Sequence, residues 1–124
     1  RMRSIPIRCM VPIGTMHLMG MLRILDGDLA VAWPTRLAVA AVEALEGEGY
    51  EVHFLPNLDE AVQGFALNGV TLGPRRFLMA EGNPTTQAFY ESLGVTCTTV
   101  EVDELAKASG AIGCLTGIVS RDLV

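Results

Sequence analysis

Two stretches of the chain show the same order of apolar and polar positions. In the first, apolar runs over 15–25 and 29–33 flank the turn signal Asp26-Gly27-Asp28, which predicts two strands joined by a tight turn. Pro34 suits a first helical position, and apolar side chains follow it at helical spacing. These side chains are Leu37, Ala41, Ala44 and Leu45. Two glycines end this helix, and the alternating run 50–55 predicts a third strand.

The second stretch repeats this order with different residues. The turn signal Gly73-Pro74 separates two apolar runs, and a third apolar run follows a predicted helix. Asn83 is a favoured N-cap, Pro84 suits the first helical position, and Phe89 and Leu93 form an apolar stripe. The three predicted strands cover 64–72, 76–80 and 95–102. Both stretches therefore predict the order strand, turn, strand, helix, strand.

The spacing of these two stretches predicts a repeat. Pro34 and Pro84 stand 50 residues apart, a period typical of arrays and propellers, although the residues themselves match poorly. A repeat unit cannot bury its apolar face alone, and about three or more units are normally needed for stability. We therefore expect a single α/β domain over 1–124 that is an incomplete repeat architecture. The expected boundaries are about 14–57 for the first module, about 60–103 for the second and about 107–122 for a closing strand.

Composition adds to the impression of an incomplete unit. Apolar residues make up 50% of the chain, the mean hydropathy is +0.38, and 19% of residues are charged. Either the core is unusually large, or a partner subunit or missing modules cover apolar surface. The sequence also begins at Arg1 without a methionine, which suggests an excised or truncated segment. We therefore expect either a homo-oligomer or a complementing N-terminal half.

Charge and cysteine usage exclude several classes of partner. The net charge of −5 argues against nucleic acid and against an anionic membrane surface. The longest charge-free run near the start has 14 residues, fewer than the roughly 18 that a membrane span needs. Cys9, Cys97 and Cys114 are odd in number and form no CxxC pair, so they fit neither a disulfide framework nor a zinc site. We expect a cytoplasmic protein with no cofactor and no metal.

The most informative cysteine is Cys114. It stands among small residues, with Gly113 before it and Gly117 after it. Glycine beside a nucleophilic side chain lets backbone approach a ligand closely, and the apolar Leu115 and Ile118 predict a buried strand. Free cysteine is also among the most buried residue types. The residues alone therefore leave two roles equally open for Cys114, a nucleophile and a core residue.

Three further polar residues are candidates for the same site. His17 is polar within an apolar run; alone it reads as a core histidine bonded to backbone, but together with Cys114 it could form a Cys/His pair. Glu60 precedes the predicted strand that carries Asn68, so Glu60 could point toward the same end of the sheet as Cys114. Arg75 and Arg76 stand at a turn, where we expect surface charges rather than an anion site.

The order of motifs resembles the C-terminal half of the guanidino-modifying (pentein) superfamily. The resemblance covers roughly 15–122, and its most specific parts are the glycine-flanked Cys114 and the pair His17-Leu18. The runs that carry it further are 68–70, 77–84, 90–95 and 101–116. Dimethylarginine dimethylaminohydrolases look nearest, with arginine deiminases and amidinotransferases further off. The resemblance implies a five-bladed α/β propeller, of which this chain would form about two modules and a closing strand.

The resemblance also implies roles. Cys114 matches the family's nucleophile and His17 its general acid/base, and the substrate would be a small cationic guanidino compound. We expect Glu60, Asn68 and Gly113 to contact that substrate. The chain is about half of a family member's length, and the N-terminal modules with a third catalytic carboxylate have no counterpart here. Deiminase-like relatives carry Asp two residues after the histidine, where this chain has Met19, so arginine deiminase activity is not expected.

Two functions follow from these observations. The first is a dimethylarginine dimethylaminohydrolase-like cysteine hydrolase, which cleaves C–N bonds of a guanidino or amidino compound through a thiouronium intermediate. The alternative is a catalytically inactive pentein half that acts as an oligomeric small-molecule binding or interaction module. A papain-like or amidase-type thiol enzyme fits less well. Such an enzyme places its cysteine before its histidine at the head of a helix, whereas Cys114 comes last.

Overall fold

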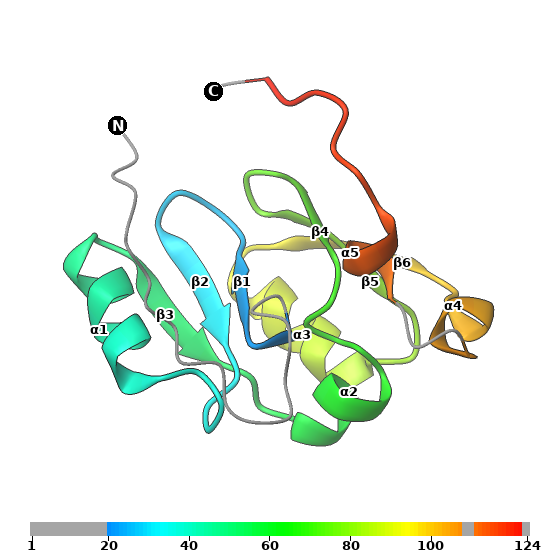
Figure 1. Cartoon of the computed structure of the whole chain (residues 1–124), viewed down its shortest axis with the longest axis horizontal. Coiled ribbons are helices and arrows are strands. Elements are labelled where there is room, and N and C mark those ends of the chain that lie inside the picture. Colours follow the sequence, from blue (N-terminus) through cyan, green and yellow to red (C-terminus); the bar gives the residue numbers. More distant parts are fainter. Residues whose placement is uncertain (1–19, 108–110, 123–124) are drawn as a thin grey trace.

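The structure of the chain is a computed structural model that describes residues 20–107 and 111–122. The order of its helices and strands is that of two similar modules followed by a short C-terminal part (Figure 1). The first module comprises β1 (Leu22–Ile24), β2 (Leu29–Ala32), α1 (Val39–Gly47) and β3 (Glu51–Phe54). The second module comprises α2 (Leu58–Gln63), β4 (Val70–Gly73), β5 (Arg76–Ala80), α3 (Pro84–Ser92) and β6 (Thr96–Val100). The C-terminal part holds α4 (Asp103–Lys107) and α5 (Ile112–Leu115).

The two sheets have the same topology. In the first, β1 pairs antiparallel with β2 and β2 pairs parallel with β3; in the second, β4, β5 and β6 do the same in the same order. A helix, α1 or α3, makes each parallel crossover, as parallel neighbours require. The predicted order strand, strand, helix, strand is therefore confirmed in both modules. The described residues form two separate three-stranded sheets and no closed sheet, so the propeller arrangement is not confirmed.

One hydrophobic core joins the modules. In Figure 1 the two sheets lie side by side, with α1 on the outer side of the first sheet and α3 near the centre. Side chains from both modules form a single buried cluster, which includes Leu25 and Val31 from the first and Phe77 and Tyr90 from the second. A second, smaller cluster packs α1 onto the first sheet. The two modules therefore share a core, and each completes the burial of the other.

Arg75 adds a polar link between the modules. Its Nε donates to Asp26 Oδ2 at 3.0 Å and its Nη2 to Asp28 Oδ1 at 3.3 Å. Its Nη1 donates to the carbonyl of Leu93 at 2.6 Å, just beyond α3. The Arg75 side chain is 38% exposed, which agrees with the expected surface charge, and it also holds the predicted turn at 26–28 against the second module.

The helix that was expected to begin at Pro34 does not begin there. Residues 34–36 form a turn in which the N–H groups of Arg36 and Leu37 donate to the carbonyl of Trp33 at 3.3 and 3.2 Å. The Arg36 guanidinium lies over the Trp33 ring at 4.7 Å, which favours this turn. Ala38 is extended, so α1 begins only at Val39.

The second correction concerns the strand expected over 64–72, because β4 begins only at Val70. Residues 64–69 form a turn instead, here called the 64–69 turn. Phe65 has a φ of 52°, in the left-handed region, and Asn68 N–H donates to the Phe65 carbonyl at 2.9 Å. An extended strand cannot contain such a residue, so the apolar run at this place fills core without pairing.

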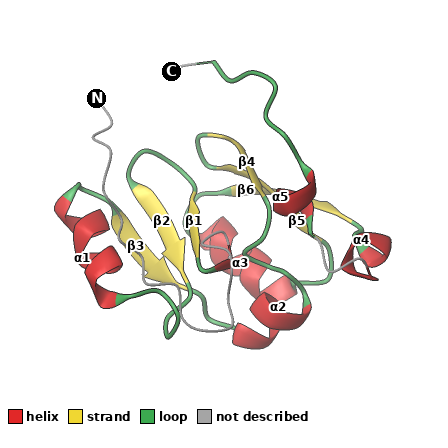
Figure 2. Ribbon diagram, viewed as in Figure 1, coloured by secondary structure: helices red, strands yellow, loops and turns green. Residues whose placement is uncertain are grey.

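The third correction concerns the closing strand expected over 107–122. Around Cys114 the chain forms the short helix α5, in which Cys114 and Leu115 N–H both donate to the Ala111 carbonyl at 3.1 and 3.2 Å. Residues 116–122 are exposed and have no regular structure, as Figure 2 shows. A strand needs a neighbouring edge, and neither sheet pairs with this segment in the described part of the chain.

Candidate active site

Cys114 lies on α5, in the C-terminal part of the chain. The helix is held by the buried residues Ala111 and Ile112 and contacts β5. Cys114 itself is exposed, two residues beyond that buried anchor. The sequence left a core residue and a nucleophile equally open, and the exposure of the thiol argues against the core role.

The Asn68 side chain forms hydrogen bonds with this cysteine and with the residue before it. Its Nδ2 donates to Cys114 Sγ at 3.2 Å, and its Oδ1 accepts a hydrogen bond from the backbone N–H of Gly113 at 3.1 Å. The Gly113 N–H can only donate, so it fixes which end of the amide carries oxygen. The amide nitrogen must then face the sulfur. Residues 46 positions apart in sequence are thereby joined at the candidate nucleophile.

Gly113 is required by close packing rather than by its backbone conformation. A Cβ atom at this position would stand 2.6 Å from Asn68 Oδ1 and 2.9 Å from the carbonyl oxygen of Gly69. Carbon and oxygen that are not bonded need more than 3 Å, so a side chain at 113 would push α5 away from the turn. The structure thus brings together three of the predicted site residues, Asn68, Gly113 and Cys114.

The 64–69 turn that carries Asn68 is tied to other parts of the fold. The buried hydroxyl of Tyr90 on α3 donates to the carbonyl of Ala66 at 3.1 Å. Asn83 Nδ2 donates to the carbonyl of Gly64 at 2.8 Å, and Arg23 Nε donates to that of Leu67 at 3.3 Å. These bonds satisfy backbone groups that no strand pairs, and they fix the turn from both modules.

Glu60 lies on α2, and its side chain reaches the start of α3. Its carboxylate accepts hydrogen bonds from the backbone N–H groups of Thr85 and Thr86 at 3.0 and 2.7 Å. Burial alone would raise the pKa of Glu60, but the hydrogen bonds from Thr86 and Thr85 outweigh it and hold the pKa below its ordinary value. The predicted N-cap Asn83 has no side-chain capping bond, so Glu60 caps this helix in its place. No hydrogen bond or ion pair of the described residues joins Glu60 to Cys114, and its expected contact with a substrate stays a prediction.

Arg23 is a residue near the site that sequence reasoning missed. Its guanidinium lies over the Phe77 ring at 5.7 Å, and its Nη2 is buried beside Gly113, 3.6 Å from where a Cβ would stand. Burial lowers the pKa of Arg23, while the negative charges that Tyr90 and Cys114 can carry oppose this effect. The signal in the sequence was a single charged residue in the otherwise apolar run 15–25.

Of the two histidines, His53 lies within the described residues and His17 does not. His17 lies outside the described residues, so its pairing with Cys114 stays a prediction. His53 lies on β3, where its Nε2 is 2.8 Å from Glu51 Oε1 and its ring stands edge-on to Phe89. His53 therefore lies within the strand that the alternating run 50–55 predicts.

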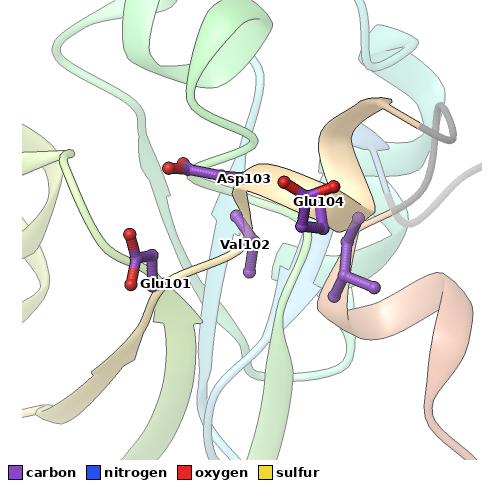
Figure 3. A pocket seen from close by; sticks show the side chains of 5 residues that line it. Glu101, Val102, Asp103 and Glu104 are labelled. Atoms are coloured by element: carbon purple, nitrogen blue, oxygen red, sulfur yellow. The ribbon is translucent and has the colours of Figure 1, made fainter.

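An acidic cavity lies at another place, where β6 leads into α4. It has a volume of about 290 Å³ and is lined by residues 101–105, which run from the end of β6 into the first turn of α4 (Figure 3). Figure 3 shows the carboxylates of Glu101, Asp103 and Glu104 along this segment. Lys107 Nζ lies 2.6 Å from Glu104 Oε1 and neutralises part of the charge. Cys114 does not line this cavity, so the cavity is not part of the site around the thiol.

Comparison with solved structures identifies the fold. The amidinotransferase SxtG from Microseira wollei, of the saxitoxin biosynthetic pathway, matches with a TM-score of 0.72 and 16% identity. The match covers 89% of this chain and 33% of SxtG. The apo structure of ArgZ, an arginine dihydrolase of the ornithine-ammonia cycle in cyanobacteria, matches with a TM-score of 0.70 and 24% identity, over 87% of this chain and 17% of ArgZ.

Over the matched part, the chain has the same fold as these two structures. No protein-family model and no curated protein matches the sequence. The chain spans about a third of SxtG and less than a fifth of ArgZ. Within the described part of the chain, no helix is long and apolar enough to cross a membrane.

Proposed function

We propose that this chain carries the nucleophile of a cysteine enzyme that acts on the C–N bonds of a guanidino or amidino compound. The observation that carries this proposal is the exposed thiol of Cys114, held by the Asn68 amide and by the close approach of Gly113. An amide donor fixed beside an exposed sulfur is an arrangement suited to a positioned nucleophile. The similarity in fold to an amidinotransferase and an arginine dihydrolase supports the substrate class.

The proposed reaction has two steps, in the manner of a dimethylarginine dimethylaminohydrolase. In the first, the Cys114 thiolate attacks the electron-poor carbon of the amidine, and an S–C bond forms as the C–N bond to the leaving amine breaks. The amine takes a proton as it departs. In the second, water attacks the same carbon, the S–C bond breaks, and the thiolate is released with a urea-type product. We propose His17 as the group that gives the proton and then receives one from water.

The substrate-binding carboxylates are proposed to come from outside this chain. A cationic guanidinium needs carboxylates around it. Because the chain spans only part of SxtG and ArgZ, we propose that further modules, or another copy of this chain, supply the missing substrate contacts. Asn68 and Gly113 would line the substrate side of the nucleophile. Three cysteines without a CxxC pair favour a reducing, cytoplasmic location.

The test compares two labelling reagents of the same size, a cationic amidine electrophile and a neutral alkylating amide, with the labelled peptides identified by mass. We expect the amidine to label Cys114 faster than the amide does, and His17→Ala to slow the amidine reaction. Cys97 is the internal control, because burial, helped by the charge of Glu91, raises the pKa of its thiol to about 11. Equal and slow labelling of Cys114 by both reagents would contradict the proposal.

A second function is favoured by one observation, the exposed apolar side chains at the C-terminal end. Leu115, Ile118 and Val119 are 57%, 63% and 101% exposed. Such a cluster next to Cys114 is suited to packing on further modules or on a second copy. An inactive, oligomeric binding or interaction module would use the same surface. Light scattering tests whether the chain forms an oligomer. A monomer at all concentrations would contradict self-association, and packing on complementing modules would then be the remaining role for this surface.

A further inference from the structure

Arg23 is a cation whose charge is unmatched within the described residues. In residues 20–107 and 111–122, no Asp or Glu forms an ion pair with it. Its Nε donates to the Leu67 carbonyl at 3.3 Å, and the Phe77 ring lies 5.7 Å from its guanidinium carbon. Its Nη2 is fully buried and has no hydrogen-bond partner in that part of the chain. Because arginine stays protonated in proteins, burying this charged group costs free energy.

The elements packed around Arg23 offer few groups that could balance this charge. The 64–69 turn and β5 present carbonyls, the Asn68 amide and the Phe77 ring, none of which ionises. From α3 the guanidinium meets Tyr90, but burial raises the pKa of this phenol far above neutral pH, so it stays uncharged. From α5 it meets Cys114, through the backbone of Gly113. Among the described residues, Tyr90 and Cys114 are thus the ionisable groups whose charges bear on Arg23.

Asn68 links the cation and the sulfur in one cluster. A Cβ at residue 113 would stand 2.6 Å from Asn68 Oδ1 and 3.6 Å from Arg23 Nη2, so the amide, the guanidinium and the Gly113 backbone lie against one another. On its other side, Asn68 Nδ2 donates to Cys114 Sγ at 3.2 Å. A donor on the sulfur and a buried cation behind it both favour a negative charge on that sulfur.

We propose that Arg23 is a positioning residue that stabilises the thiolate of Cys114. This inference rests on the proposed function, in which Cys114 is the nucleophile, and it assigns the source of the positive charge that keeps the sulfur reactive. In this proposal the guanidinium acts through its charge and forms no bond to the reacting carbon. The charge of Arg23 is screened little by salt, because its Nη2 is buried.

The test is the pH dependence of Cys114 labelling by neutral iodoacetamide, between about pH 6 and about pH 10, where only the thiolate reacts. The variant R23Q removes the charge and keeps a donor for the Leu67 carbonyl, whereas R23K keeps a positive charge. The matched control is R36M, which removes an arginine that lies over Trp33 in the first module. We expect R23Q to label about tenfold more slowly near pH 7 and to approach the wild-type rate near pH 10. We expect R23K to stay within about threefold of wild type and R36M to be unchanged.

Two outcomes would overturn the proposal. A wild-type pH profile in R23Q would show that the charge does not act on the sulfur. A reduction by the same factor at every pH would show that Arg23 only shapes access to Cys114. Rapid labelling of the half-buried Cys97 would reveal loss of the fold in R23Q, and R23M then serves as the uncharged variant under the same criteria. Because iodoacetamide is neutral, this result is independent of amidine recognition, so failure of the proposed function and failure of this inference can be told apart.

Discussion

Replacing Gly113 by alanine tests whether the contact between α5 and the 64–69 turn controls Cys114. The added Cβ would stand 2.6 Å from Asn68 Oδ1 and 2.9 Å from the Gly69 carbonyl oxygen. The backbone at 113 is not in the left-handed region, so alanine can adopt it without strain. The perturbation is therefore purely steric, and it is placed between the amide and the residue before the candidate nucleophile.

The size of the effect follows from these distances. Ordinary van der Waals contact begins at about 3.4 Å, so α5 and Asn68 must separate by roughly 0.8 Å. The bonds from Gly113 N–H to Asn68 Oδ1 and from Asn68 Nδ2 to Cys114 Sγ are already 3.1 and 3.2 Å long, and both would be lost. Overpacking costs about 1–3 kcal/mol, but α5 has four residues and an exposed end and can move outward. We therefore expect the lower half of that range, about 1–2 kcal/mol, together with a large effect on the sulfur.

The assay measures both quantities on the same protein. Urea unfolding gives the change in the free energy of unfolding, and amidine labelling gives the reactivity of Cys114. We expect Gly113→Ala to lower the labelling rate about tenfold or more, since the sulfur loses its amide partner. Gly117→Ala is the matched control, because a Cβ at 117 meets no atom within 4 Å. It should change neither quantity.

The reasoning would be refuted by a Gly113→Ala protein with unchanged stability and unchanged labelling of Cys114. That result would mean that the turn and α5 do not touch in solution. A loss of stability without any loss of reactivity would separate the two effects. It would show that the Asn68 amide supports the fold of this region but not the nucleophile.

Two further substitutions test the surroundings of the site. Glu60→Gln should destabilise the fold by about 1 kcal/mol at neutral pH, because α3 loses a charged cap, as urea unfolding would measure. Since the pKa of Glu60 in the folded state lies below its ordinary value of 4.5, the advantage of wild type over Glu60→Gln should be full above that pH and shrink as the pH falls below it; an advantage that grew on acidification would contradict the cap. Gly69→Ala should cost about 3 kcal/mol or more, because its Cβ would collide with the Leu78 carbonyl and stand 2.5 Å from the Phe77 ring. Gly47→Ala, with no atom within 4 Å, is the control; because alanine favours the helical backbone of α1, it should leave the stability unchanged or raise it by up to about 1 kcal/mol in thermal unfolding.

The elements that the sequence predicted well are those set by local chemistry. Asp26-Gly27-Asp28 makes the first hairpin turn, and Gly49 and Gly94 follow α1 and α3 with φ of 91° and 80°. Left-handed backbone is strongly favoured by glycine, so these positions can be recognised from the sequence alone. The repeat of strand, strand, helix and strand follows from the same signals, and it is confirmed in both sheets.

The elements that the sequence did not predict depend on distant contacts. The run 64–72 is apolar because it fills the shared core, and its backbone is satisfied by the side chains of Tyr90, Asn83 and Arg23 rather than by a neighbouring strand. Hydrophobicity reports burial, not pairing, so a strand was expected where a turn occurs. The same limit applies to Glu60, because its capping of α3 joins residues 25 and 26 positions apart.

The candidate site is thus a consequence of how the two modules meet. Asn68 reaches Cys114 only because the 64–69 turn is held on one side by Tyr90 and Asn83 of the second module and on the other by Arg23 of the first. No short segment contains this arrangement, since each of these bonds joins residues at least 19 positions apart. The reactivity of the sulfur should therefore depend on the integrity of both modules. The sequence points to the cysteine, whereas the junction of the modules supplies the amide beside it.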